Sequence, residues 1–166
     1  IGGGDWANQR IIPDSVRCWS KNKTVELRNP HSTRPWQHVL EPLGGYLSLA
    51  VQLSQNKALH GEAFNFGPLM QQNKSVLDLV KQMSLSWPKV KWIECKPQSP
   101  KFYESGLLKL NCDKALHSLN WHALLNFEET VSLTAEWYRT FYESPDMIKN
   151  ITEKQISDYS KKLLTN

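Results

Sequence analysis

The sequence predicts an α/β fold, and three observations lead to this expectation. Apolar residues recur at helical spacing in several segments, among them 43–55 and 127–142. Short segments such as 24–27 alternate between apolar and polar residues, as strands do. Helix-like and strand-like segments follow one another along the chain, which is typical of α/β or α+β proteins. The 166 residues are enough for one domain with its own core.

The amino-terminal quarter is expected to contain a loop, a helix and a strand. Three consecutive glycines within 2–6 predict a loop in which the backbone can approach a ligand closely. Pro13 suits the first turn of a helix, and Asn22 marks its end. Residues 24–27 are expected to be a strand, and 28–35 a loop that two prolines stiffen.

A helix and a strand are predicted next. The helix is expected over 43–55, where a broad apolar stripe follows the start signals Glu41 and Pro42. Residues 63–66 are expected to be a buried strand that ends in a Gly-Pro turn. Ser75 is then expected to cap a further helix.

The remaining elements follow from similar signals. Glu128 and Glu129 lie in the first turn of the helix over 127–142, where the helix dipole favours negative charge. The final segment, 151–164, is either a docked helix or a frayed one. A strand is expected at 90–94, a polar loop at 95–106, an extended segment at 107–110, and a short helix with Asp113 as its N-cap through Leu119.

Composition disfavours several classes of protein. Hydrophobic residues make up 40% and charged residues 22%, which is ordinary for a soluble globular protein. No apolar run approaches the roughly 20 residues of a membrane span. The net charge of +4 is spread along the chain, which disfavours nucleic-acid binding. Without a starting Met or a signal peptide, the chain is expected to begin inside a longer cytoplasmic protein.

Metal ligation is not expected. Cys18, Cys95 and Cys112 are isolated from one another, so no zinc-binding pair exists, and they fit a reducing compartment. His31 and His38 show no ligand spacing and no acidic partner nearby, which favours structural histidines.

The loop at 28–35 carries candidate binding residues. Arg28 and Arg34 lie six residues apart, and a guanidinium can hold phosphate oxygens in two places. Together with the glycine-rich loop at 2–6, this pattern suits a pyrophosphate. The alternative is two solvated surface arginines, and the spacing alone leaves both open.

A second candidate is the polar loop that holds Lys101, Tyr103 and Glu104. A buried carboxylate there could bind sugar hydroxyls or a ribose, and the alternative is a solvated loop. The sequence contains no Gly-x-Gly-x-x-Gly, no Gly-x-Ser-x-Gly and no Tyr-x-x-x-Lys. No catalytic residue is therefore assigned to this chain.

Several motifs together point to one enzyme family over nearly the whole chain. The string Arg-Pro-Trp-Gln-His-Val-Leu-Glu-Pro-Leu occupies 34–43. The other strings are Gly-Gly-Gly-Asp-Trp at 2–6, Arg-Ile-Ile-Pro-Asp at 10–14, Arg-Asn-Pro-His at 28–31, Phe-Asn-Phe-Gly-Pro at 64–68, Leu-Lys-Leu-Asn-Cys-Asp-Lys-Ala at 108–115 and Leu-Asn-Trp at 119–121. This series resembles the CDP-glucose 4,6-dehydratases, of the extended short-chain dehydrogenase/reductase superfamily. Related sugar-nucleotide enzymes carry an Arg-Asp-Trp or Arg-Asp-Tyr version of the first string.

The resemblance implies the carboxy-terminal part of a Rossmann-type extended short-chain dehydrogenase, with 1–166 forming a mixed α+β substrate-binding region and part of the parallel sheet. A full member is an NAD-dependent lyase of dideoxysugar biosynthesis for lipopolysaccharide O-antigen. It converts CDP-D-glucose to CDP-4-keto-6-deoxy-D-glucose by oxidation at C4, loss of water across C5 and C6, and return of hydride to C6. NAD and the catalytic residues belong to an amino-terminal Rossmann half, absent from this chain, so the chain alone is expected to be inactive. Full members are expected to be homo-oligomers.

The resemblance also implies roles in substrate binding. Arg34 stands where the superfamily has its phosphate-gripping arginine, and Arg10 where a polar residue approaches the diphosphate. Leu27 and Arg28 follow the strand that runs beside the nucleotide base.

The loop with Lys101, Tyr103 and Glu104 is implied to lie near the diphosphate and ribose, because Glu104 matches the glutamate of a His-Glu-Ala sequence in the family. This chain departs from the family pattern at Tyr103, at Ser105, and at Leu69, where relatives often have Asn.

Two alternatives stay open. The chain could serve a dehydratase or epimerase for a different nucleotide sugar, or be a catalytically incomplete fragment. The strand at 63–66 is expected to complete the Rossmann sheet of the absent half, so the isolated chain should expose apolar surface and be poorly stable.

Overall fold

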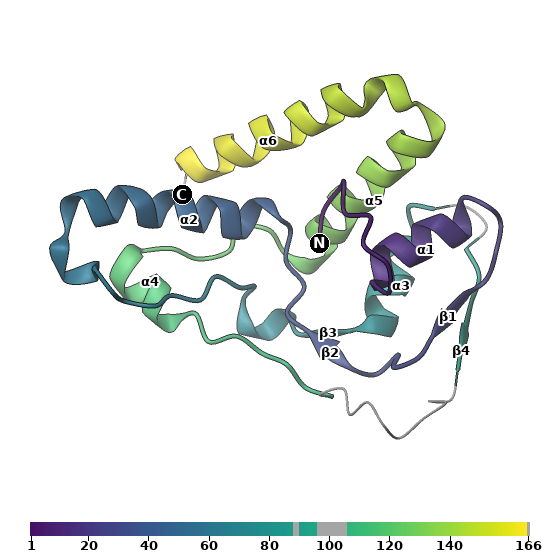
Figure 1. Ribbon diagram of the computed structural model, residues 1–166, viewed down its shortest axis with the longest axis horizontal. Coiled ribbons are helices and arrows are strands. Elements are labelled where there is room, and N and C mark those ends of the chain that lie inside the picture. Colours follow the sequence, from purple (N-terminus) through teal and green to yellow (C-terminus); the bar gives the residue numbers. More distant parts are fainter. Residues whose placement is uncertain (88–89, 96–105, 166) are drawn as a thin grey trace.

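The structure is a computed structural model, and it describes residues 1–87, 90–95 and 106–165. Figure 1 shows the arrangement of its elements. The α-helices are α1 (Ile11–Trp19), α2 (Leu40–Gln55), α3 (Val76–Ser84), α4 (Asp113–Leu119), α5 (Phe127–Glu143) and α6 (Ile148–Thr165). The strands are β1 (Val25–Leu27), β2 (Thr33–Arg34), β3 (Lys74–Ser75) and β4 (Trp92–Glu94), and short 3-10 turns lie at Lys57–Leu59, Met70–Gln72 and Pro145–Met147.

The strands form two small sheets. β1 and β4 are parallel, with Val25 opposite Trp92. β2 and β3 are antiparallel, with Thr33 opposite Ser75. Thr33 also forms a parallel bridge with Leu107, so β2 has a neighbour on each side. The predicted strands at 24–27 and 90–94 are confirmed as β1 and β4. β2 and β3 were missed, because two residues are too few to show an alternating pattern.

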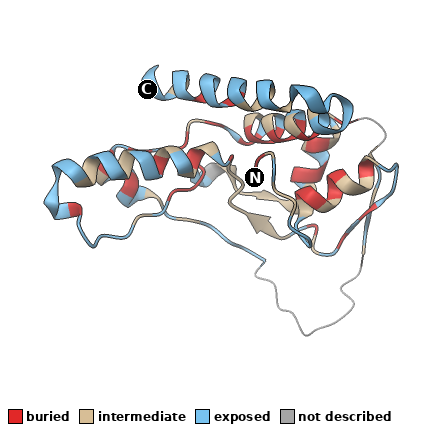
Figure 2. Ribbon diagram, turned by 45° about the horizontal axis from the view of Figure 1, so that its top comes forward, coloured by how far each residue is buried: buried red, intermediate tan, exposed pale blue. Residues whose placement is uncertain are grey.

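The main core lies where α1, α3 and α5 pack with the β1–β4 sheet. Its fully buried members include Val16, Leu27, Leu79 and Tyr138. Figure 2 shows buried residues concentrated on α1 and α5, while α6 is mostly exposed. The sequence periodicity of the helix at 127–142 is thus explained by a face that packs on this core.

A smaller core joins α2 to α4. It contains Phe66, Leu119 and Trp121, and the ring centroids of Phe66 and Trp121 lie 4.8 Å apart. Gly45 makes this packing possible, since a Cβ there would lie 2.4 Å from the Phe66 ring. The segment from 59 to 66 is therefore held by side-chain packing rather than by a sheet.

Two capping boxes fix helix starts. Ser75 Oγ accepts the Asp78 N–H at 3.1 Å, which confirms the predicted cap of α3. Asn126 and Glu129 form the equivalent box at α5. The cap predicted at Asp113 is one residue late, because Asp113 is already the first residue of α4 and its N–H binds Asn111 Oδ1.

Two predictions about 40–66 differ from the structure. The helix α2 begins at Leu40, three residues before the predicted start, with Val39 at its cap position. The predicted strand at 63–66 is wrong for the described residues, where this segment has no regular structure. A strand needs a ladder partner, and this segment forms no ladder with any described segment, although Asn65 Nδ2 donates to the Asn111 carbonyl at 3.2 Å.

The carboxy-terminal helix α6 is docked, which settles the alternative that the sequence left open. Gln155 Nε2 donates to the Leu133 carbonyl at 2.9 Å, and Tyr159 donates to the Glu41 carboxylate at 2.9 Å. α6 thus joins α5 to α2. Among the described helices, none has the length and apolar character that crossing a membrane requires.

Candidate functional site

The segments that carry Arg10 and Arg34 come together at the start of α2. The main-chain nitrogen of Ile1 donates to the Gln37 carbonyl at 2.6 Å, and the Val39 N–H donates to the Ile1 carbonyl at 2.8 Å. Gln37 Nε2 also donates to the Phe66 carbonyl at 2.8 Å. Three parts of the chain far apart in sequence therefore meet here.

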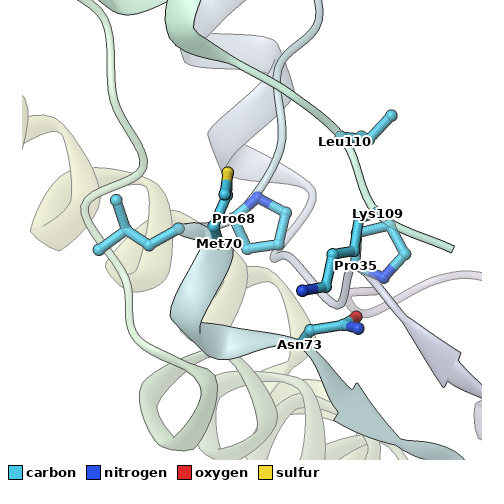
Figure 3. Close-up of a pocket in the computed structure, with 7 residues that line it drawn as sticks. Pro35, Pro68, Met70, Asn73, Lys109 and Leu110 are labelled. Carbon is cyan, nitrogen blue, oxygen red and sulfur yellow. The ribbon is translucent and has the colours of Figure 1, made fainter. Parts of the chain in front are cut away.

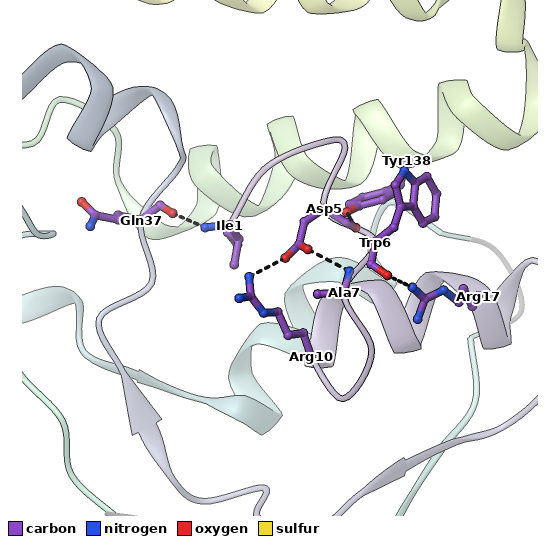
Figure 4. A network of polar contacts seen from close by, with 8 residues as sticks. All are labelled: Ile1, Asp5, Trp6, Ala7, Arg10, Arg17, Gln37 and Tyr138. Carbon is purple, nitrogen blue, oxygen red and sulfur yellow. Dashed lines mark hydrogen bonds and ion pairs between the residues drawn. The ribbon is translucent and has the colours of Figure 1, made fainter. Parts of the chain in front are cut away.

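Asp5 is the centre of a polar network in the amino-terminal loop (Figure 4). Its carboxylate accepts the Ala7 N–H and Arg10 Nη1, each at 3.0 Å. Its main-chain oxygen accepts the Tyr138 hydroxyl. The Ala7 hydrogen bond lowers the pKa of Asp5, and burial raises the pKa of Tyr138 to about 12. At neutral pH, Asp5 is therefore ionised and Tyr138 is protonated.

The Arg10 side chain is 67% exposed although it pairs with Asp5. Arg10 occupies the cap position of α1, and its carbonyl accepts the Asp14 N–H at 3.0 Å. A guanidinium has five N–H donors, so the pairing leaves donors for a ligand. An exposed ion pair of this kind contributes at most about 1 kcal/mol to stability, so a phosphate can compete with Asp5 for Arg10.

The glycines of this loop make room for protein side chains. A Cβ on Gly3 would lie 2.0 Å from the Trp137 ring, and one on Gly2 would lie 2.7 Å from Val39. Gly4, with φ +82°, has open space around it. Gly2 and Gly3 therefore serve packing, and the sequence alone could not distinguish this use from contact with a phosphate.

Arg34 lies directly opposite Lys74 in the β2–β3 pair. Its Nη1 donates to the Thr33 carbonyl at 2.8 Å. Lys74 Nζ lies 5.9 Å from the centroid of the Phe127 ring. Directly opposed side chains share one face of a sheet, and two like charges there repel each other. Arg34 and Lys74 therefore place two positive charges on one face of the β2–β3 pair.

Leu27 and Arg28, which the sequence predicted beside a nucleotide base, differ in exposure. The Leu27 side chain is 1% exposed and belongs to the core, so only its main chain could contact a ligand. Its carbonyl already accepts the Cys95 N–H at 2.9 Å. Arg28 follows directly and is exposed. Lys101, Tyr103 and Glu104 lie outside the described residues.

The string at 34–43 also contains two buried titratable groups. Glu41 is 1% exposed, and Oε1 accepts the N–H groups of Leu124 and Leu125 at 2.9 and 2.7 Å. Burial raises the pKa of Glu41 and lowers the pKa of His38 to about 4. His38 is 2% exposed and Nδ1 faces the Leu40 N–H at 3.4 Å. Both residues therefore hold the start of α2 in place and are too deeply buried to meet a ligand.

A small depression lies beside Pro35 (Figure 3). Its volume of about 10 Å³ leaves room for about one water molecule. It is lined by Pro35, Pro68, Leu69, Met70, Asn73, Lys109 and Leu110. Asn73 and Lys109 were not predicted as site residues, because their proximity depends on how distant segments pair, which no local motif reveals.

No family model matches this chain. A curated relative, the CDP-glucose 4,6-dehydratase of Salmonella typhimurium, is 40% identical over 160 residues. The match covers 96% of this chain and 44% of the relative, in its carboxy-terminal part. The resemblance recognised from the sequence is therefore confirmed, and the chain spans less than half the length of this relative.

Solved structures confirm the fold. The dTDP-glucose 4,6-dehydratase of Bacillus anthracis, in complex with NAD, matches with a TM-score of 0.64 and 17% identity, over 91% of this chain and 44% of its own. The UDP-glucose-4-epimerase of Stenotrophomonas maltophila, with bound NAD, matches with a TM-score of 0.68 and 16% identity, over 83% and 42%. The chain thus has the α/β fold of the carboxy-terminal part of Rossmann-type dehydratases and epimerases.

Proposed function

We propose that this chain is the CDP-sugar-binding region of a CDP-glucose 4,6-dehydratase, which would convert CDP-D-glucose to CDP-4-keto-6-deoxy-D-glucose with NAD. The observation that carries the proposal is the 40% identity to the Salmonella typhimurium enzyme over 96% of this chain. In this proposal residues 1–166 are one substrate-binding unit.

The geometry gives this proposal physical support. Arg34 and Arg10 belong to segments joined by hydrogen bonds at Ile1, and each carries a planar guanidinium whose N–H groups suit phosphate oxygens. Cations held by a folded loop lose less freedom on binding than flexible ones. The role of these residues is therefore to bind and orient the diphosphate, with Arg28 at the side of the base.

We infer that the main NAD site lies outside this chain. The sequence lacks the Gly-x-Gly-x-x-Gly fingerprint, and the space at Gly2 and Gly3 is filled by Val39 and Trp137. NAD would be held by an amino-terminal Rossmann half, which would also supply the catalytic groups. The chain by itself would then be inactive, and we assign no chemical step to it.

We infer that the solvent face of α2 contacts that amino-terminal half. Leu43, Tyr46, Leu47 and Val51 are 47%, 58%, 71% and 58% exposed and follow one another along this helix. Exposed apolar surface of this kind marks contact sites. The neighbouring segment 63–65 has no regular structure and makes no main-chain hydrogen bond to the described part of the chain, so its N–H and C=O groups are available to a partner.

Calorimetric titration with CDP-glucose and UDP-glucose tests the proposal. The chain is titrated alone and together with the separately produced amino-terminal part of the Salmonella typhimurium relative. We expect selective binding of CDP-glucose at least when the amino-terminal part of the relative is present. Preference for UDP-glucose would indicate a different nucleotide-sugar enzyme, and binding of neither sugar in either form would contradict the proposed function.

A further inference from the structure

The depression beside Pro35 brings together side chains from three extended segments. Thr33 is opposite Ser75 on β3 and bridges Leu107 in parallel. Pro35 follows directly after β2, Asn73 comes directly before β3, and Lys109 lies two residues after Leu107. All three side chains line the depression. Figure 3 shows them around the depression.

Two polar groups in this depression have unused bonding capacity. Asn73 Oδ1 is buried and has no hydrogen-bond partner within the described ranges. Lys109 is exposed and makes no ion pair with any residue that the structure describes. A buried acceptor without a donor is unfavourable by about 1–3 kcal/mol, so a ligand that supplies a donor would be favoured.

Lys109 and Asn73 together indicate which chemical groups a ligand would need. The Lys109 ammonium donates three hydrogen bonds and attracts an anion, while Asn73 Oδ1 accepts one from a hydroxyl. The apolar rim around them, with Leu69 44% and Met70 57% exposed, adds no competing polar group. The volume of about 10 Å³ admits a hydroxyl beside Asn73 rather than a ring, and the exposed Lys109 can hold a second group outside this volume.

We propose that Lys109 and Asn73 are further substrate-binding residues, with Lys109 holding a phosphate oxygen and Asn73 accepting a hydrogen bond from a hydroxyl of the hexose. This proposal rests on the proposed function, because a nucleoside diphosphate sugar carries both groups close together. Lys109 lines the depression together with Pro35, the residue that follows Arg34. Both cations therefore belong to segments that meet at the end of β2.

Equilibrium titration of single variants tests the proposal, in the chain alone and with the amino-terminal part of the relative. Lys109→Gln should weaken binding of CDP-glucose and of CDP by about 10- to 100-fold, the range of a charge-assisted hydrogen bond. Lys109→Arg should retain affinity within about threefold, because it keeps the charge. Asn73→Ala should weaken CDP-glucose about threefold or more and leave CDP unchanged, since CDP lacks the hexose hydroxyls.

Lys81→Gln is the matched control, because Lys81 is exposed on α3 and outside the site. Arg34→Gln reports on the proposed function separately. If Arg34→Gln weakens binding while Lys109→Gln behaves like Lys81→Gln, the role of Lys109 is wrong and the proposed function stands. Equal effects of Asn73→Ala on CDP and CDP-glucose would contradict the hydroxyl contact. If the wild type binds neither ligand in either form, both proposals fail.

Discussion

The helices α2 and α5 have similar sequence patterns and opposite surroundings. On α5, apolar residues such as Phe127, Val131 and Tyr138 are buried in the main core. On α2, the buried residues are Glu41 and Gly45, while Leu47 is 71% exposed. An apolar stripe therefore predicts that a face will be covered, but it does not say whether the same chain covers it.

This difference indicates two functions for the helices. α5 completes the fold, since its aromatic residues surround Trp6 and so anchor the loop that carries Arg10. α2 is attached to the fold through polar contacts of Glu41 and through the smaller core that it shares with α4, and it leaves a further apolar face exposed. Burying a side chain such as Leu47 against a partner would contribute roughly 1.5–3 kcal/mol.

The largest effect is expected at the polar attachment of α2. Glu41→Ala removes the acceptor for Leu124, Leu125 and Tyr159 and should lower the free energy of unfolding by about 3–5 kcal/mol. Glu41→Gln keeps one acceptor oxygen and should lower the free energy of unfolding by less than Glu41→Ala does. Urea denaturation measures both, and a loss below about 1 kcal/mol for Glu41→Ala would show that α2 is held otherwise.

The pH dependence of stability should report on His38. Its folded pKa of about 4 lies below the ordinary histidine value of 6.5, so the folded state prefers the neutral ring. Its contribution is fully present above about pH 6.5 and is lost as the pH falls towards 4, by about 3 kcal/mol in total. The raised pKa of Glu41 acts in the opposite direction and is common to wild type and His38→Gln. Denaturation of both proteins at pH 7 and pH 4.5 isolates the histidine, and parallel losses would contradict its role.

Two truncations compare the regions directly, one of an apolar side chain that packs against α5 and one of an apolar side chain on the exposed face of α2. Trp6→Ala removes a ring that packs 5.2 Å from Tyr138 and 4.8 Å from Phe141, and should lower stability by about 2–3 kcal/mol. Leu47→Ala in the isolated chain should change stability by less than about 0.5 kcal/mol. The comparison fails if the two variants unfold at the same urea concentration.

The smallest effect is expected from the link between Asp5 and Arg10. Asp5→Asn keeps an acceptor for the Ala7 N–H and removes the charge beside Arg10, so stability should fall by about 0.5–1 kcal/mol. The loss should shrink at high salt because the pair is exposed. Thermal unfolding in low and high salt measures this, and a salt-independent loss would assign the effect to packing.

Local signals in the sequence predicted the helix starts better than the contacts between segments. The cap at Ser75 was predicted because a serine stands directly before an apolar helical pattern, and the structure adds the capping box with Asp78. The β2–β3 pair, the bridge to Leu107 and the place of Lys109 depend on register between distant segments, which no local pattern encodes. The segment 63–66 has strand composition but lacks a partner among the described residues, so composition alone gave the wrong state.

Complementation tests the central claim that α2 contacts an amino-terminal half in a CDP-glucose dehydratase. The chain is mixed with the amino-terminal part of the Salmonella typhimurium relative and NAD, and consumption of CDP-glucose is followed by chromatography. We expect turnover with the wild-type chain and loss of turnover with Leu47→Asp, whose isolated stability should match the wild type because position 47 is exposed. Equal turnover with both chains would contradict the account, as would no turnover with either.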